Sequence, residues 1–319
     1  MTLERLSLDR AERLSAPSAY RFSFPEPPGE EAPGPRAGQA SRAASGPAAA
    51  AGSPDGRGPR AAAGGSDRRG PATAANGLDG RGPAAYLSLR SEGDMRYVRG
   101  GTNPNRERFF AGLGLDPASV LGLELSHSRG VAFPLEGAVR AEAEPFAAGP
   151  GQCDGILLRD PAYAASVTVA DCMPIWLHDR ASGAFGVLHS GWKGTGILER
   201  ALAALRERYG SGPASVSVIL GPAIGSCCYA VPEERALGFA REFGAEAAPF
   251  TEGRWRLDLR AANIALARRL GVGALLSVEA CTSCEESLGS FRRQGPEAFT
   301  RMAALAAYPP RLAAGRGPS

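Results

Sequence analysis

The sequence predicts an α/β or α+β fold, a single domain in which mixed β-sheets are flanked by helices. Short apolar runs typical of buried strands alternate with amphipathic helical segments along much of the chain. These segments do not follow the regular strand–helix–strand repeat of a doubly wound parallel sheet. The two observations together favour mixed sheets covered by helices.

Length and charge exclude several classes of protein. The chain of 319 residues has 36 basic and 33 acidic side chains, whereas nucleic-acid or membrane-surface binding calls for a basic excess. No apolar run reaches the roughly 18 residues of a membrane span, and the charged N-terminus lacks the apolar core of a secretory signal. Six cysteines in this length do not form a disulfide scaffold. We expect a cytoplasmic globular protein, monomeric by default, that binds neither nucleic acid nor membranes.

Residues 26–84 differ in composition from the rest of the chain. Ala, Gly and Pro make up 38 of these 59 residues, and Leu78 is the only sizeable apolar side chain. Such a segment cannot bury enough apolar area to offset roughly 1–2 kcal/mol of backbone entropy per residue. We predict a disordered insertion here, between an N-terminal segment of the domain at 1–25 and the main part at 85–309, with a disordered tail at 310–319.

Within the domain, hydrophobic periodicity predicts the elements in order. Helices are expected at Arg106–Leu113, Ile197–Gly210 and Leu259–Leu270, and strands at Val120–Leu125, Ala165–Val169, Pro174–Leu177, Ala184–Leu188, Ser215–Leu220 and Leu275–Val278. The Ile197–Gly210 helix is the clearest, because its apolar residues recur on one face and it stops at a glycine.

Polar residues interrupt or follow three of these strands. His127 and His189 each follow an apolar run, and Asp171 and Cys172 interrupt another. Burying an acid and a thiol together is costly without partners, which indicates a site. Two imidazoles and one thiolate match a catalytic zinc site with an open fourth position. Buried histidines that are hydrogen-bonded within the core are an alternative explanation of the same residues. The third histidine, His178, precedes a polar turn and is expected at the surface.

The segment HSGWKGTG, residues 189–196, contains Lys193, the only lysine of the chain. Its glycines directly precede a predicted helix, where unpaired N–H groups suit an anion such as phosphate. An ordinary tight turn produces the same pattern. Arg292 and Arg293 are expected to be solvated, or to supply one contact to an anionic substrate group.

The remaining cysteines give a weaker signal. Cys281 and Cys284 form a C-x-x-C motif, and Cys227 and Cys228 are adjacent. The chain has no second C-x-x-C motif to complete a four-cysteine zinc site. We therefore predict that these cysteines, like Cys153, are ordinary structural residues.

Four stretches resemble a known family. CDGILLRDPAYAASVTVADCMPIWLHD, GAFGVLHSGWKGTG, LGPAIGSCCYAVPEE and CTSCEESLGSFRRQGPEAFTRMA are similar to the polyphenol oxidoreductase laccase-domain family, also called the YfiH or peptidoglycan editing factor family. GDMRYVRGGTNPNRERFFAGLGL resembles the family segment before its first metal histidine. The resemblance covers nearly all of residues 93–308 and implies a YfiH-like fold.

The resemblance also implies a function. It implies a Zn2+ site whose ligands carry over to His127, Cys172 and His189. It implies phosphorolysis of adenosine, inosine, guanosine and methylthioadenosine, with adenosine deamination as a further activity, so the expected partners are purine nucleosides and phosphate. We expect Lys193 and Arg106 to bind phosphate, and Asp171 to orient a metal ligand or move a proton.

The chain departs from the family pattern at several positions. Leu125 occupies the place of a glutamine that the family has before the first metal histidine. Ala230 occupies the place of a glutamate that the family has after the tyrosine, here Tyr229. The stretch Leu288–Phe291 replaces a Phe-Phe-Ser-Tyr pattern, and Arg21–Pro27 lacks a Thr-Arg-x-Gly-Gly loop. The metal ligands are retained, whereas the residues expected to contact the purine differ.

Two other functions are consistent with these residues. Cys172 and His189 would also serve as the nucleophile and base of a cysteine hydrolase or amidase, with peptidoglycan precursors as a target. Alternatively, the protein is a non-catalytic partner that binds through residues 26–84. A copper oxidase is disfavoured, because multinuclear copper sites need more histidine than three residues supply.

Overall fold

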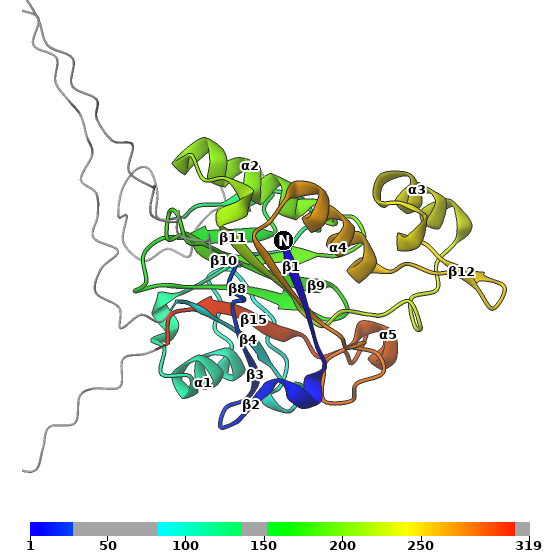
Figure 1. Ribbon diagram of the computed structural model, residues 1–319. Helices are drawn as coiled ribbons and strands as arrows, with labels where there is room; N and C mark the ends of the chain where they lie inside the picture. The colour runs from blue at the N-terminus through cyan, green and yellow to red at the C-terminus, as the bar shows by residue number, and fades with distance from the viewer. Residues whose placement is uncertain (28–81, 135–151, 310–319) are drawn as a thin grey trace, which may run out of the picture. The chain divides into compact units, whose positions relative to one another are not determined.

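The computed structural model describes residues 1–27, 82–134 and 152–309, which form two β-sheets with helices on their outer faces (Figure 1). The larger sheet has the strand order β1 (Thr2–Leu6), β14 (Ala274–Val278), β11 (Val216–Leu220), β9 (Met173–Asp179), β10 (Phe185–Ser190), β7 (Gly155–Leu158) and β6 (Val131–Ala132). The smaller sheet has the order β2 (Glu12–Ser15), β3 (Ser18–Ser23), β4 (Ala84–Ser88), β15 (Met302–Ala307), β8 (Ala164–Val169) and β5 (Val120–Gly122). A short pair, β12 (Phe250–Thr251) and β13 (Arg254–Trp255), stands apart from both.

Both large sheets are mixed, as the sequence predicts. In the larger sheet β1, β14 and β11 run parallel to one another, the pairs β11–β9, β9–β10 and β10–β7 are antiparallel, and the edge pair β7–β6 is parallel. In the smaller sheet all pairs are antiparallel except β5 with β8. Because β11 and β14 pair in parallel, the loops that follow these two strands leave the same edge of the sheet.

The central strands of both large sheets are buried on both faces, so side chains that alternate along such a strand enter different cores. In β9, Ile175 and Leu177 pack towards the helices, whereas Trp176 packs into the core between the two sheets. In β15, Ala304 faces the larger sheet and Leu305 faces the opposite side. This two-sided burial explains why the strands read as continuous apolar runs rather than as alternating patterns.

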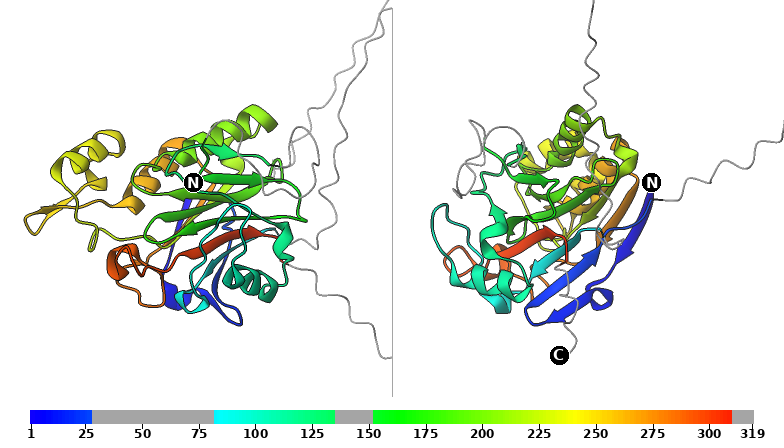
Figure 2. Two further views of the ribbon diagram at one scale, coloured as in Figure 1. Left: turned by 180° about the vertical axis from the view of Figure 1, so that it is seen from behind. Right: turned by 90° about the vertical axis from the view of Figure 1, so that its left-hand side faces the viewer.

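The helices cover the two outer faces (Figures 1 and 2). Helices α2 (Ile197–Tyr209), α3 (Glu233–Phe243) and α4 (Leu259–Leu270) contribute to the core on the outer face of the larger sheet. Helix α1 (Pro104–Gly112) places Phe109 and Phe110 against the smaller sheet. A fifth helix, α5 (Phe291–Gln294), forms a single turn before β15.

The predicted helices agree closely with the structure. The buried residues of α2 are Ile197, Leu198, Ala201, Leu202 and Leu205, and the helix ends at Gly210 with a left-handed φ of 70°. Helix α4 has the predicted bounds, begins after Asp258, whose side chain accepts from the N–H of Ala261, and ends at Gly271. The apolar spacing of each helix and the glycine that follows it made both helices readable from the sequence.

Other boundaries differ from the prediction. The strand expected over Val120–Leu125 ends at Gly122, because the chain then turns into the loop that carries His127. The four N-terminal strands, β7, β15 and helix α3 were not predicted. In β1 every residue is exposed or only partly buried, so its short, charged sequence gave little periodic signal.

The predicted insertion joins two paired strands. Ser23 at the end of β3 pairs with Ala84 at the start of β4, so its two ends lie side by side. Ala84 is itself buried in β4, which places the end of the predicted segment inside the sheet. Residues 28–81 and the predicted tail from residue 310 lie outside the described part of the chain. Among the described residues, no helix combines the length and the apolar character of a membrane span.

His178 is not the surface residue that the sequence suggested. It lies within β9 beside Phe185 of β10, and its ring packs 5.7 Å from the ring of Phe24. Burial lowers the pKa of His178 to about 4, and the neighbouring Arg180 guanidinium adds to this effect. The folded protein therefore holds this imidazole neutral.

The lowered pKa of His178 predicts an acid-sensitive contribution to stability. Above its ordinary pKa of 6.5 the residue is neutral in both states, but as pH falls from there towards 4 only the unfolded chain takes up the proton. This difference destabilises the folded protein by about 1–2 kcal/mol between about pH 7 and pH 5. The change His178→Gln should flatten the pH dependence of the unfolding free energy in urea by that amount. An unchanged dependence would contradict this assignment.

Candidate metal centre and its cavity

Three predicted ligands converge at one end of the strands. His127 lies in the loop after β5, Cys172 precedes β9, and His189 lies on β10. One ligand atom from each lies within 4.8 Å of the others, and the two imidazole centroids are 5.0 Å apart. The structure thus brings together residues that are 45 and 17 positions apart in the chain.

Strand pairing and a glycine explain how the thiol reaches this position. Because β9 and β10 pair with Met173 opposite Ser190, Cys172 lies across from the residue that follows β10. That residue is Gly191, and a Cβ atom there would lie 2.7 Å from the Cys172 sulfur. Any side chain at position 191 would displace the thiol from the histidines.

Asp154 holds both histidines in place. Its fully buried carboxylate accepts hydrogen bonds from the backbone N–H groups of Ser126, His127 and Ser128 at 3.3, 2.9 and 2.7 Å. The hydroxyls of Ser126 and Ser128 add two more. Its other contact is with Nδ1 of His189, at 3.1 Å. One carboxylate therefore fixes the loop that carries His127 and the ring orientation of His189.

The electrostatics match the geometry. Burial alone would raise the pKa of the Asp154 carboxyl, but the hydrogen bonds from His189 and Ser128 hold it well below its usual range. Burial likewise opposes ionisation of Cys172, yet the neighbouring His189 and His127 lower the pKa of this thiol to about 6. Against the effect of burial, Cys172 and Asp154 raise the pKa of His189 to about 10. Cys172 is thus held as a thiolate at neutral pH.

Backbone strain accompanies the ligands. His127 and Asp171 adopt φ angles of 62° and 81°, in the left-handed region that residues with a Cβ rarely occupy. In His127 the hydrogen bond from its backbone N–H to Asp154 compensates for the energetic cost of this conformation. Such conformations persist only where surrounding contacts determine them, and they gather at functional sites.

The three residues fit a zinc ion. Two imidazoles and a thiolate are a common ligand set for catalytic zinc, which leaves one coordination position open. The Asp154–His189 contact is the carboxylate–histidine pair that typically supports a metal-bound imidazole. Because Nδ1 of His189 is engaged by Asp154, its Nε2 is the nitrogen left to bind the ion. The exposed side of His127 faces a cavity, so the open position would be accessible.

Asp171 reaches the same region by a different set of contacts. One carboxylate oxygen accepts from the Thr282 hydroxyl at 2.6 Å, and the other accepts from the backbone N–H of Arg292 at 2.7 Å. Its own carbonyl accepts from the N–H of Ile224. Asp171 therefore ties the Cys172 turn to the loops after β11 and β14.

A cavity of about 730 Å³ opens beside the metal centre. Its volume is in the range typical of small-molecule sites. It is lined by the three candidate ligands, by Asp171, by the aromatic residues Tyr97, Trp192, Tyr229, Phe291 and Phe299, and by the arginines Arg96, Arg235, Arg292 and Arg301. Flat aromatic surfaces and guanidinium groups thus face the same space.

Two residues predicted to bind phosphate lie away from this lining. Arg106 is buried on α1, where it donates to the Met95 carbonyl and stacks on Tyr97 and Phe110. Burial lowers the pKa of its guanidinium to about 10. Lys193 is exposed beside Trp192 and lines a separate hollow with Arg129. The structure places neither among the residues that line the cavity.

Other residues take positions that the sequence did not reveal. The role of Asp154 was not predicted. Its position directly before the apolar strand Gly155–Leu158 was the available signal, since an acidic residue there is buried with the strand. Arg235 stacks 4.5 Å over Trp192, and Arg292 contacts the Ala230 carbonyl beside Tyr229. Burial raises the pKa of Tyr229 to about 12, and the Cys172 thiolate adds to the effect, so its hydroxyl stays protonated.

The chain is similar to proteins of known sequence. Residues 86–308 match the family model described as multi-copper polyphenol oxidoreductase laccase. The chain is 31% identical over 193 residues to a purine nucleoside phosphorylase of Corynebacterium glutamicum, covering 60% of this chain and 76% of that one.

Solved structures show the same fold. YlmD from Geobacillus stearothermophilus superposes with a TM-score of 0.63 at 26% identity, covering 72% of this chain and 93% of that one. The YfiH protein of Bacillus licheniformis superposes with a TM-score of 0.61 at 26% identity, covering 70% and 92%. The predicted YfiH-like mixed fold is confirmed.

The role of Asp154 can be tested by metal affinity. Asp154→Asn keeps the shape of the side chain but turns an amide N–H2 towards groups that are themselves donors, so the histidines lose their common anchor. We expect zinc affinity to fall by about 10–100-fold, measured by competition with a chromogenic chelator. Asp160→Asn, an exposed acid beyond the other end of β7, is the matched control and should leave affinity unchanged. Equal affinities in the two variants would contradict the role of Asp154.

Proposed function

Because the chain belongs to the multi-copper polyphenol oxidoreductase laccase family, we propose that it is a purine nucleoside phosphorylase with a zinc ion at its centre. The observation that supports this most directly is the cavity, in which the His127–Cys172–His189 centre faces aromatic rings and guanidinium groups. A nucleoside offers a flat base and a polar sugar, and phosphate offers a compact anion. The cavity has a complementary group for each.

Zinc suits this centre better than copper does. The chain has three histidines, and one of them, His178, lies in a different part of the sheet. Multinuclear copper sites need more histidines than these two. A blue-copper site adds a weak axial ligand such as methionine to two imidazoles and one thiolate, and no methionine is among the described residues that line the cavity. When bound, zinc would supply Lewis-acid polarisation of a substrate group at its open position.

The aromatic wall is suited to the purine. Trp192, from the loop before α2, and Tyr229, from the loop after β11, both line the cavity. Stacking of a base on such rings is worth about 1–3 kcal/mol and tolerates different purines. The protonated Tyr229 hydroxyl is a hydrogen-bond donor to a ring nitrogen or a sugar oxygen.

Arg292 and Arg235 are the groups we assign to phosphate. Both line the cavity, and both lie close enough to Tyr229 for their charges to lower its pKa against the effect of burial. Arg301 also lines the cavity but is paired with Asp94 at 3.0 Å, which offsets its charge. In phosphorolysis a phosphate oxygen bonds to the anomeric carbon, the carbon–nitrogen bond breaks, and the base leaves with the electron pair and a proton. The guanidinium groups of Arg292 and Arg235 would bind the phosphate dianion and orient it for this displacement.

Adenosine deamination would use the same cavity. The purine carbon that bears the amine would have to face the metal centre, whereas phosphorolysis requires the sugar to approach the bound phosphate. Asp171 lies beside Cys172 in the lining of the cavity, and its carboxylate accepts hydrogen bonds from Thr282 and Arg292. We therefore propose that Asp171 holds this part of the lining in position.

A second function is favoured by the paired pKa shifts of Cys172 and His189. A thiolate beside an imidazolium is the arrangement of a cysteine hydrolase, which would fit an amidase acting on peptidoglycan precursors. The two functions differ in how the thiol behaves when metal is bound. Rapid iodoacetamide labelling of Cys172 in zinc-replete protein supports the hydrolase, whereas labelling only after chelation supports the phosphorylase.

The phosphorylase function predicts a strict requirement for phosphate. Zinc-replete protein should release hypoxanthine from inosine in phosphate buffer and not in its absence, as followed by chromatography of the base. Cys172→Ala should abolish this release, because the centre loses its only thiolate ligand. Zinc-replete protein that releases no base with phosphate present would overturn the proposal.

The assignment of phosphate to Arg292 predicts a selective kinetic change. Arg292→Ala removes a guanidinium from the cavity but keeps the backbone N–H that binds Asp171. Loss of a charge-assisted hydrogen bond should raise the KM for phosphate by about tenfold or more, with a smaller change in the KM for inosine. Lys193→Ala is the control, since Lys193 lies outside the cavity lining, and its KM for phosphate should change less than about twofold. The reverse order would return the role to Lys193.

A further inference from the structure

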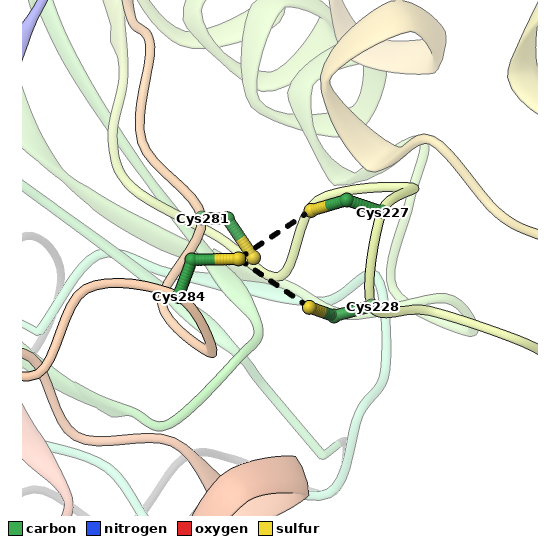
Figure 3. A group of neighbouring side chains, drawn as sticks. All are labelled: Cys227, Cys228, Cys281 and Cys284. Carbon is green, nitrogen blue, oxygen red and sulfur yellow. Dashed lines mark hydrogen bonds between the residues drawn. The ribbon is translucent and has the colours of Figure 1, made fainter.

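Four cysteines that the sequence left unexplained lie together outside the cavity. Cys227 and Cys228 come from the loop after β11, and Cys281 and Cys284 come from the loop after β14 (Figure 3). All four sulfur atoms lie within 4.8 Å of one another. The missing second C-x-x-C motif is thus replaced by an adjacent pair on a neighbouring loop, because β11 and β14 are parallel and release their loops at the same edge.

The distances between the sulfurs fit one tetrahedral ion. The Cys284 sulfur lies 3.5 Å from that of Cys228 and 3.7 Å from that of Cys227. Four thiolates placed about 2.3 Å from a central zinc are about 3.8 Å from one another. A disulfide joins only two sulfurs, which lie about 2.0 Å apart. The Cys284 sulfur instead has two neighbours, the sulfurs of Cys227 and Cys228, at similar and longer distances. An iron–sulfur cluster spreads its four thiolates over several metal atoms and needs a wider opening.

The backbone is arranged to bring thiolates together. The N–H of Gly225 donates to the Cys281 sulfur at 3.2 Å, a contact that stabilises negative charge on a metal ligand. A Cβ atom at Gly225 would lie 3.1 Å from the Cys227 sulfur and 3.3 Å from Cβ of Cys281. Glycine therefore permits the two loops to approach.

Positive charge lies close to the cluster. The partly buried Arg293 donates to the carbonyls of Thr282, Ser283 and Glu285, and to that of Leu288. Arg256 donates to the Cys227 carbonyl on the other loop. A zinc ion with four thiolates carries a net charge of about −2. Arg293 offsets part of this charge, whereas Arg256 is itself paired with Glu252 at 2.7 Å. The acidic neighbour Glu285 turns its carboxylate to the Ser287 N–H and hydroxyl instead.

We propose that Cys227, Cys228, Cys281 and Cys284 bind a structural zinc ion, distinct from the centre in the cavity. Four protein ligands leave no open position, so this ion takes no part in chemistry. It joins two loops that build one wall of the cavity. Cys228 is followed by Tyr229, and Thr282, between Cys281 and Cys284, donates to Asp171.

Metal content of purified full-length protein tests the proposal. Wild-type protein should hold about one more zinc ion per chain than the Cys228→Ser/Cys284→Ser double variant, measured by mass spectrometry of the metal. The difference should persist in a Cys172→Ala background, which separates this site from the one in the cavity. Cys153→Ser, a cysteine in neither group, is the control and should lose no zinc. Equal zinc in the double variant and in wild type, or iron in place of zinc, would overturn the proposal.

A second measurement does not depend on how the serine variant folds. Cobalt added to apo Cys172→Ala protein should give the intense near-ultraviolet sulfur-to-cobalt absorption of a tetrathiolate site, and zinc should displace it. Alkylation and intact mass of freshly purified protein should show no disulfide among the four cysteines. A disulfide in that material, or no sulfur-to-cobalt absorption, would contradict the site.

Discussion

The carboxylate of Asp154 is the contact on which the candidate metal centre depends. A fully buried carboxylate is costly unless its oxygens are hydrogen-bonded, and here three backbone N–H groups, two hydroxyls and one imidazole converge on it. The same contacts hold His127 in its left-handed conformation and direct the ring of His189. Removal of this charge would therefore disturb two ligands at once, and it would leave a set of buried donors without an acceptor.

Asp171 has the corresponding role for the turn that carries Cys172. It joins the Cys172 turn to the loops after β11 and β14 through Ile224, Thr282 and Arg292. The third ligand is thus held by contacts that Asp154 does not make. Because the four-cysteine group lies on these same two loops, a metal ion there would stiffen the wall without touching a substrate.

The comparison of sequence and structure separates local from non-local information. Helices α2 and α4 were readable because their apolar faces and capping residues are contiguous in the chain. His127, Cys172 and His189 stood out because polar residues broke or ended apolar runs. Asp154 lies 35 positions from His189, and Cys228 lies 56 positions from Cys284. Only the pairing of the strands brings such residues together, and the apolar pattern of a strand carries no information about its neighbours. Arg106 and Lys193, which were predicted to bind phosphate, are not among the residues that line the cavity, because the position of a basic residue in the sequence does not show which space its side chain faces.

Charge explains why the two candidate metal centres would behave differently. Zinc with one thiolate and two neutral imidazoles has a net charge of about +1, which the nearby Asp154 carboxylate offsets. The arginines at the cavity, Arg235 and Arg292 among them, then leave an excess of positive charge facing the substrate space. Zinc with four thiolates is an anionic group, and it is placed outside the cavity with Arg293 and Arg256 beside it. An anionic substrate such as phosphate would thus be drawn to the open centre and away from the closed one, because the sign of the local charge differs between them.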